Sequence, residues 1–197
     1  YTSDTNKFHT YNKIAAPIEE LVSYNPDTLK SLLEASVKKR LMSERPVAFF
    51  LSGGLDSSLI CSIGAKLLGK VDTFSIGIGD SPDLIAAKQV SEHIKSNHTE
   101  IRFTAEEGLD MLKKVIFSLE TYDCTTIRAS VPMYLLSKYV SKNTDFKVIL
   151  SGEGADELFG GYLYFHNAPS EDDFQSESLR LIDNVHAFDV LRADRCT

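Results

Sequence analysis

Apolar residues recur along this chain in two periods, one typical of strands and one typical of helices. Short apolar runs predict four strands, at residues 47–51, 71–78, 98–103 and 146–150. Helical spacing predicts helices at residues 29–42, 59–68, 81–95, 104–119 and from Pro132 onward, with a last helix at 170–189. Residues 120–131 are expected to form a loop.

Strands that alternate with helices of about 10–15 residues predict a parallel sheet with right-handed crossovers. The expected fold is α/β, a doubly wound parallel sheet with a helical C-terminal extension. Residues 1–27 are polar and contain Pro17 and Pro26, so they are expected to be an arm or linker before a domain at 28–197. Because ligands of such sheets bind beyond the carboxyl ends of the strands, the loops there are the candidate site.

The loop after the first predicted strand reads Ser52-Gly53-Gly54-Leu55-Asp56-Ser57-Ser58. Glycines let the backbone approach an anion, the first amides of the following helix lack internal partners, and the serines add donors. We therefore predict a phosphate-binding loop. It lacks the lysine of a Walker loop and the spaced glycines of a dinucleotide fingerprint. The alternative is a glycine turn that merely ends a buried strand.

A second loop, after the fourth predicted strand, reads Ser151-Gly152-Glu153-Gly154-Ala155-Asp156-Glu157. Carboxylates beside a bound phosphate would repel it unless a cation lies between them, and Mg²⁺ prefers oxygen ligands. Asp56 and Asp156 are therefore the candidate metal ligands, and Glu153 could reach a reacting carbonyl group. The alternative is a helix N-terminus at which acidic residues are simply favourable.

Charge, cysteine spacing and the length of the apolar runs indicate which binding partners and which cellular compartment to expect. The net charge is −7 and the basic residues are scattered, which argues against a nucleic-acid surface. Cys61, Cys124 and Cys196 show no paired spacing and indicate a reducing compartment, so we expect a cytoplasmic protein. The apolar runs are too short to span a membrane. The chain opens at Tyr1 and stops directly after a helical pattern, so we expect a segment of a longer polypeptide, incomplete at its C-terminus.

The first loop resembles that of the N-type ATP pyrophosphatases, which cleave ATP between its α- and β-phosphates. Together with the second loop and three further segments, it resembles the synthetase domain of the glutamine-dependent asparagine synthetases. The three segments are residues 80–84, 120–130 and 188–195. The resemblance runs from about residue 29 to 195, and it implies an adenine nucleotide alpha hydrolase-like fold, here truncated.

The resemblance implies roles for individual residues. The pyrophosphate of ATP would be held by Ser52, Gly53, Gly54, Asp56, Ser57 and Ser58. The rest of ATP would contact Phe50, Leu51, Ile76, Ser151 and Gly152, partly through backbone groups. Thr126 and Arg128 would hold aspartate, and Glu153 would bind substrate and act on a β-aspartyl-AMP intermediate, so Glu153 and Arg128 are the candidate catalytic residues.

The residue type and position of Arg128 also suggest a role in substrate binding, independently of the resemblance. It follows a loop, and its guanidinium could form a bidentate pair with the carboxylate of an amino-acid substrate. The alternative is an ordinary salt bridge to a structural carboxylate. Residues 162–165, Tyr-Leu-Tyr-Phe, are expected to be core rather than a stacking platform.

By this resemblance the chain would convert aspartate to asparagine with ATP and Mg²⁺, releasing AMP and pyrophosphate. Ammonia would come from a glutaminase domain outside the segment. One rival is another amide-forming adenylating enzyme, such as a β-lactam synthetase-like protein, and the other is a non-catalytic homologue. The sequence does not give the oligomeric state, and a homodimer is carried as a hypothesis.

Overall fold

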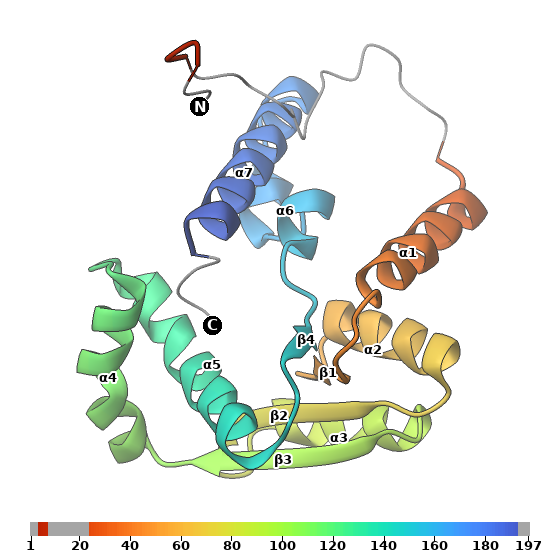
Figure 1. Ribbon diagram of the computed structural model, residues 1–197. Helices are drawn as coiled ribbons and strands as arrows, with labels where there is room; N and C mark the ends of the chain where they lie inside the picture. Colours follow the sequence, from red (N-terminus) through yellow and green to blue (C-terminus); the bar gives the residue numbers. More distant parts are fainter. Residues whose placement is uncertain (1–3, 8–23, 193–197) are drawn as a thin grey trace. The chain divides into compact units, whose positions relative to one another are not determined.

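The computed structural model describes residues 4–7 and 24–192, with side chains described as far as residue 184. The chain divides into two compact units, which are described separately: Asn25–Glu153, and Tyr1–Tyr24 together with Gly154–Thr197 (Figure 1). Most of the predicted arm, the last three residues of segment 188–195 and Cys196 lie outside the described residues.

The larger unit alternates helices and strands along the chain (Figure 1). Its strands are β1 (Val47–Phe50), β2 (Asp72–Ile78), β3 (Asn97–Phe103) and β4 (Val148–Leu150). Its helices are α1 (Pro26–Arg40), α2 (Leu55–Leu68), α3 (Pro82–His93), α4 (Ala105–Leu119) and α5 (Cys124–Asn143). All four predicted strands are confirmed.

The strands form one parallel sheet in the order β3-β2-β1-β4. From β1 the chain first adds β2 and β3 on one side, and it then crosses back to place β4 on the other side. The order of the strands therefore reverses between β1 and β4, and in open α/β sheets the crevice at such a reversal is where ligands bind. The predicted α/β doubly wound fold is confirmed.

Each face of the sheet has its own apolar core, because successive side chains of a strand point to opposite faces. On one face, Phe49 and Leu51 pack with Cys61 of α2 and Ala87 of α3. On the other face, Ala48 and Phe74 pack with Leu136 and Val140 of α5. Helices thus cover both faces, which leaves the carboxyl edge of the sheet to the loops.

Side-chain caps set where four of these helices begin. The capping residues are Asn25 for α1, Ser81 for α3, Thr104 for α4 and Asp123 for α5. The capping box of Thr104 with Glu107 is confirmed. Helix α1 begins at Pro26, earlier than the predicted residue 29, because Asn25 accepts hydrogen bonds from the first amides of the helix.

The expected loop at residues 120–131 is wrong, because α5 already begins at Cys124. Its cap is Asp123, whose carboxylate accepts a 2.7 Å hydrogen bond from the amide of Thr126. The prediction that a helix begins at Pro132 or its neighbour is also wrong, because Pro132 lies inside α5. Proline removes one backbone hydrogen bond from a helix interior, but the buried Val131 and Leu136 on either side of it anchor the helix through that point.

The smaller unit contains α6 (Ala155–Phe159), a short 3₁₀ helix (Leu163–Asn167) and α7 (Glu171–Arg192). The predicted helix at 170–189 is confirmed, whereas α6 and the 3₁₀ helix were not predicted. The expectation that residues 162–165 are core is wrong for most of them: Leu163 is 82% exposed and Tyr164 49%, and of these residues Phe165 is the buried one.

The aromatic rings of the smaller unit instead stack on one another. The ring centroids of Tyr162 and Tyr164 are 5.9 Å apart, those of Tyr164 and Phe165 4.9 Å, and those of Phe165 and Phe174 4.7 Å. Glu177 ties this stack to α7, because it accepts hydrogen bonds from Arg180 and from the Tyr164 hydroxyl. These bonds, the one from Arg180 most, lower the pKa of Glu177 to about 2.

Within the described residues, no helix has both the length and the apolar character that crossing a membrane requires.

A buried polar cluster joins β2 to β3. The ring of His98 lies with its Nδ1 2.9 Å from Thr73 Oγ1 and its Nε2 3.1 Å from Ser75 Oγ. Burial lowers the pKa of His98 from 6.5, and the nearby Glu100 only partly opposes that shift. The folded protein therefore takes up this proton less readily than the unfolded chain does.

Above about pH 6.5, His98 is neutral in both the folded and the unfolded protein, so it should not reduce the free energy of unfolding. Below that pH the unfolded chain binds the proton more readily, so the free energy of unfolding should fall as the pH decreases. Urea denaturation between pH 8 and pH 5 measures this slope. Replacing the exposed His93 of α3 (His93→Gln) should leave the slope in place, whereas His98→Asn should flatten it. A His98→Asn protein that keeps the full slope would contradict this assignment.

Candidate anion-binding site

The N-terminus of α2 differs from those of the other helices in its unit. Its N-cap is Gly54, with φ −70° and ψ 165°, and no side chain caps it. The other four helices of the larger unit each have a side chain that accepts from their first amides. The first amides of α2 are therefore the ones left for an external acceptor, and the positive end of the helix dipole points the same way.

Two serines hold the loop in shape before any ligand arrives. The hydroxyls of Ser52 and Ser57 are 2.8 Å apart, and the Ser52 amide donates to Ser57 Oγ over 3.2 Å. Ser57 Oγ also donates to the carbonyl of Gly54. Ser57 is buried and Ser52 is exposed. Ser57 therefore holds the loop from its buried side, whereas the Ser52 side chain is accessible to a ligand.

Gly53 allows α3 to pack directly against the loop. Its φ is +83°, a conformation that residues with a side chain rarely adopt. A Cβ at this position would lie 2.5 Å from the amide nitrogen of Ala87 and 2.6 Å from Cβ of Ala86. The path of the loop therefore depends on a glycine on one side of the contact and on small residues on the other.

The second loop lies against the first. A Cβ at Gly152 would be 2.8 Å from the amide nitrogen of Ser57 and 2.9 Å from the carbonyl carbon of Asp56. This contact follows from the pairing of β1 with β4, in which Phe49 is opposite Leu150. The two serine–glycine loops therefore form one corner at the point where the strand order reverses. In the same corner, the amide of Glu153 donates to Ser151 Oγ over 3.4 Å.

Two polar side chains of the corner have no partner within the described part of the chain. The carboxylate of Asp56 is half-buried and makes no hydrogen bond or ion pair there. The hydroxyl of Ser58 is buried and equally unpaired among those residues. Buried polar groups nearly always have a partner, and each one left without costs about 1–3 kcal/mol. These two groups are therefore places where a ligand, an ion or water would supply one.

The residues expected to contact the rest of ATP lie on the neighbouring strands. Leu51 is 1% exposed, so only its main chain can face a ligand. Phe50 and Ile76 are partly buried and pack on the α5 side of the sheet. For Leu51 at least, contact with a ligand is therefore limited to the main chain.

The residues expected to hold aspartate begin α5. Helix α5 has 20 residues and is therefore about 30 Å long. Its last turn lies shortly before the start of β4 in the chain, so its first turn lies toward the carboxyl edge of the sheet. The amide of Thr126 donates to the Asp123 carboxylate, and this bond, with a smaller contribution from the Thr126 hydroxyl, lowers the pKa of Asp123. Arg128 is exposed, and it makes no ion pair with any of the described residues, so both its proposed role and the alternative of a structural salt bridge stay predictions.

The remaining candidates lie where the two units meet in the sequence. Glu153 is the last residue of the larger unit, and Asp156 lies in the first turn of α6 in the smaller unit. The pairing of Asp56 with Asp156 at one metal ion therefore stays a prediction. Sequence reasoning missed Ala86, Ala87 and Asp123. Two adjacent small residues on a helix and an Asp three residues before Thr126 are the signals that could have identified them.

Fold and corner together define a doubly wound α/β domain with a candidate anion-binding loop at its switch point. A family model described as "Asparagine synthase" matches residues 28–197. The chain belongs to the asparagine synthase family. It is 55% identical over 177 residues to "Asparagine synthetase [glutamine-hydrolyzing]" of Homo sapiens, which covers 87% of this chain and 32% of that protein. It is 49% identical over 207 residues to the protein of that name from Gallus gallus, covering 97% and 37%.

The chain thus spans about a third of the length of the curated relatives it matches. Among solved structures, an NMN synthetase from Francisella tularensis aligns with a TM-score of 0.47 and 15% identity, over 82% of this chain and 72% of that one. An NH3-dependent NAD synthetase from Campylobacter jejuni aligns with a TM-score of 0.44 and 21% identity, over 69% and 58%. Similarity this distant says nothing about function.

We expect Gly53→Ala to destabilise the domain by about 1–3 kcal/mol more than Gly79→Ala does. Both positions have positive φ, +83° and +56°, but a Cβ at Gly79 would meet nothing within 4 Å. The control therefore carries only the backbone strain, and the difference measures the contact with α3. Chemical denaturation of the two variants gives both values, and equal losses would show that α3 does not constrain the loop.

Proposed function

We propose that this chain is the synthetase part of a glutamine-hydrolysing asparagine synthase, a ligase that forms a carbon–nitrogen bond. It would convert aspartate to asparagine through β-aspartyl-AMP, and it would release AMP and pyrophosphate. Family membership and the names of its relatives support this function. The observation that carries it is the uncapped N-terminus of α2 at the switch point, beside a loop whose serines and glycines suit a phosphate.

In this proposal the triphosphate of ATP lies over the corner formed by the two loops. The amides of the first turn of α2, with Ser52, Gly53 and Gly54, would hold the pyrophosphate. Ser57 would act indirectly, because its hydroxyl is already bonded within the loop. Ser58 offers the unpaired hydroxyl described above. Adenosine would lie along the ends of β1, β2 and β4, against the main chain near Phe50, Leu51, Ile76, Ser151 and Gly152.

The residues present fit a magnesium ion that arrives with the phosphates. The described part of the chain contains no cluster of three or more metal-ligating side chains. Mg²⁺ in nucleotide sites needs only one or two carboxylates besides phosphate oxygens and water. Asp56 supplies a half-buried carboxylate without a partner among the described residues, and Asp156 is the proposed second ligand. The ion would neutralise charge on the departing pyrophosphate.

Aspartate would be held at the start of α5. Arg128 offers a guanidinium that has no ion pair among the described residues, and its fork matches a carboxylate. Thr126 would contribute hydrogen bonds beside it, within the turn that Asp123 caps. This arrangement would leave the β-carboxylate free to approach the nucleotide.

In this reaction the protein would mainly position the reactants and would form no covalent intermediate with them. An oxygen of the β-carboxylate attacks the α-phosphorus, and the bond to the β-phosphate breaks. Ammonia next attacks the acyl carbon of β-aspartyl-AMP, AMP leaves, and the nitrogen loses a proton. Glu153, beside the corner, is the proposed residue for the intermediate and for that proton. Preorganised amides and hydroxyls would stabilise the charge that develops on the leaving pyrophosphate.

The relatives are named glutamine-hydrolysing. We therefore propose that ammonia reaches this chain from a glutaminase domain outside residues 1–197. We further propose that the protein works in the cytoplasm and forms a homodimer.

The test of the proposed reaction is product identity. Incubated with ATP, Mg²⁺, aspartate and ammonia, the full-length protein that contains this chain should release AMP and pyrophosphate and form asparagine. ADP as the product would reject the chemistry. Amide formation from a different carboxylic acid, but not from aspartate, would identify a relative such as a β-lactam synthetase-like enzyme, and no turnover with any acid would identify a non-catalytic homologue.

Asp56→Asn keeps the shape of the side chain but removes the charge that the ion requires. We expect this variant to lose about 100-fold in the rate of pyrophosphate release. The matched control is Asp145→Asn, because Asp145 is exposed and makes no interaction within the described residues. Wild-type rates in Asp56→Asn would exclude Asp56 from metal binding.

Arg128→Lys keeps the positive charge and removes the bidentate geometry. We expect the KM for aspartate to rise about tenfold, equivalent to about 1.4 kcal/mol, while the KM for ATP stays nearly unchanged. Steady-state kinetics with each substrate varied in turn separates the two constants. The control is Arg45→Lys, at an exposed arginine outside the proposed site. A rise in the KM for ATP alone would place Arg128 at the nucleotide instead.

A further inference from the structure

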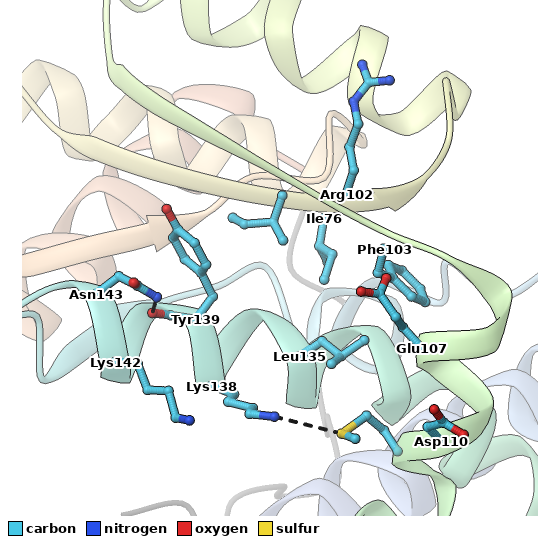
Figure 2. Close-up of a pocket in the computed structure, with 12 residues that line it drawn as sticks. Ile76, Arg102, Phe103, Glu107, Asp110, Leu135, Lys138, Tyr139, Lys142 and Asn143 are labelled. Carbon is cyan, nitrogen blue, oxygen red and sulfur yellow. Dashed lines mark hydrogen bonds between the residues drawn. The ribbon is translucent and has the colours of Figure 1, made fainter.

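A cavity of about 360 Å³ lies on the α5 side of the sheet (Figure 2), and no residue of either serine–glycine loop lines it. Strands β2 and β3 form its floor, and helices α4 and α5 form its walls. Ile76 is the one proposed nucleotide contact that also lines it. The volume is within the range of small-molecule sites, which is about 300–1,000 Å³.

The α5 wall carries two lysines one helical turn apart: Lys142 is exposed, and Lys138 extends toward Met111 of α4 (Figure 2). Lys138 is half-buried, and its partner within the described residues is the thioether sulfur of Met111, 4.0 Å away. A thioether is a weak acceptor for an ammonium group. Neither lysine pairs with a carboxylate in the described part of the chain.

The other charged groups of the lining are engaged or exposed. The Glu107 carboxylate accepts a 2.7 Å hydrogen bond from the amide of Thr104 as part of the α4 capping box. Arg102 points to the opposite face of the sheet (Figure 2), where it pairs with Glu100 and Asp80. Asp110 is exposed at the far end of the cavity from Lys142. The cation that is half-buried and lacks an oxygen partner is therefore Lys138.

Between the charged ends the lining is apolar. Ile76 and Ile101 come from the sheet, and Leu135 comes from α5 (Figure 2). Phe103 at the end of β3 and Met111 of α4 extend this surface. The cavity thus pairs an apolar floor with two ammonium groups. It offers neither a free guanidinium nor helix N-terminal amides, the groups that usually select phosphate.

We propose that this cavity binds a small organic carboxylate with an apolar body. Its carboxylate pairs with Lys138 and Lys142, and its body lies on Ile101, Leu135 and Ile76. The inference does not depend on the proposed activity: it uses the side chain of Ile76, whereas the proposed nucleotide contact is with the main chain there, and no residue of either loop lines the cavity.

The probes are 4-phenylbutyrate and its neutral counterpart 4-phenylbutan-1-ol, titrated calorimetrically into the full-length protein. We expect saturable binding of the acid at least about tenfold tighter than that of the alcohol. Lys138→Met keeps the length and apolar character of the stem and removes the charge, and it should cost the acid about tenfold while leaving the alcohol unchanged. Lys113→Met, at an exposed lysine of α4 outside the cavity, is the control.

Lys138→Gln provides a second test if the methionine variant folds poorly, and circular dichroism checks the fold of each. Saturating ATP should not displace the acid, which distinguishes this cavity from the proposed nucleotide site. The proposal is overturned if the acid does not bind, if acid and alcohol bind equally, or if both Lys138 variants bind the acid as wild type does. It is also overturned if 4-phenylbutyl phosphate binds more tightly than the acid.

Discussion

The close packing of two glycines determines the shape of the carboxyl edge of this sheet. Gly53 lets the first loop lie on Ala86 and Ala87 of α3, and Gly152 lets the second loop lie on the first turn of α2. Neither contact leaves room for a Cβ. Because both loops leave neighbouring strands, these contacts bring the two serine–glycine segments into one corner, and the proposed nucleotide site depends on that corner.

The polar groups of the corner divide into two kinds. Ser52 and Ser57 form hydrogen bonds with each other and with the loop backbone, and these bonds preorganise the loop. The first amides of α2, the Asp56 carboxylate and the Ser58 hydroxyl are left without side-chain partners in the described residues. A site that has already ordered its own loop need not do so when a ligand binds, and that lowers the entropic cost of binding.

Helix α5 carries residues of the proposed aspartate site and of the cavity. Its first turn carries Thr126 and Arg128, and its second half supplies Leu136 and Val140 to the core as well as Lys138 to the cavity. Its start was hidden from sequence reasoning by Pro132, which usually marks the beginning of a helix rather than its interior. Capping by Asp123 and burial of Val131 outweighed that local preference.

The sequence alone determined the strands, most helices and both loops, because these depend on short-range patterns: apolar period, capping residues and glycine spacing. It could not show that the Leu51 side chain is buried in the core, or that the Ser57 hydroxyl is hydrogen-bonded within its own loop. Nor could it show that Tyr162 and Tyr164 stack on each other instead of being buried in the core. Nor could it show that Gly53 meets Ala86 across 33 residues of chain. Such contacts join residues distant in sequence, and only the folded arrangement of sheet and helices decides which of them meet.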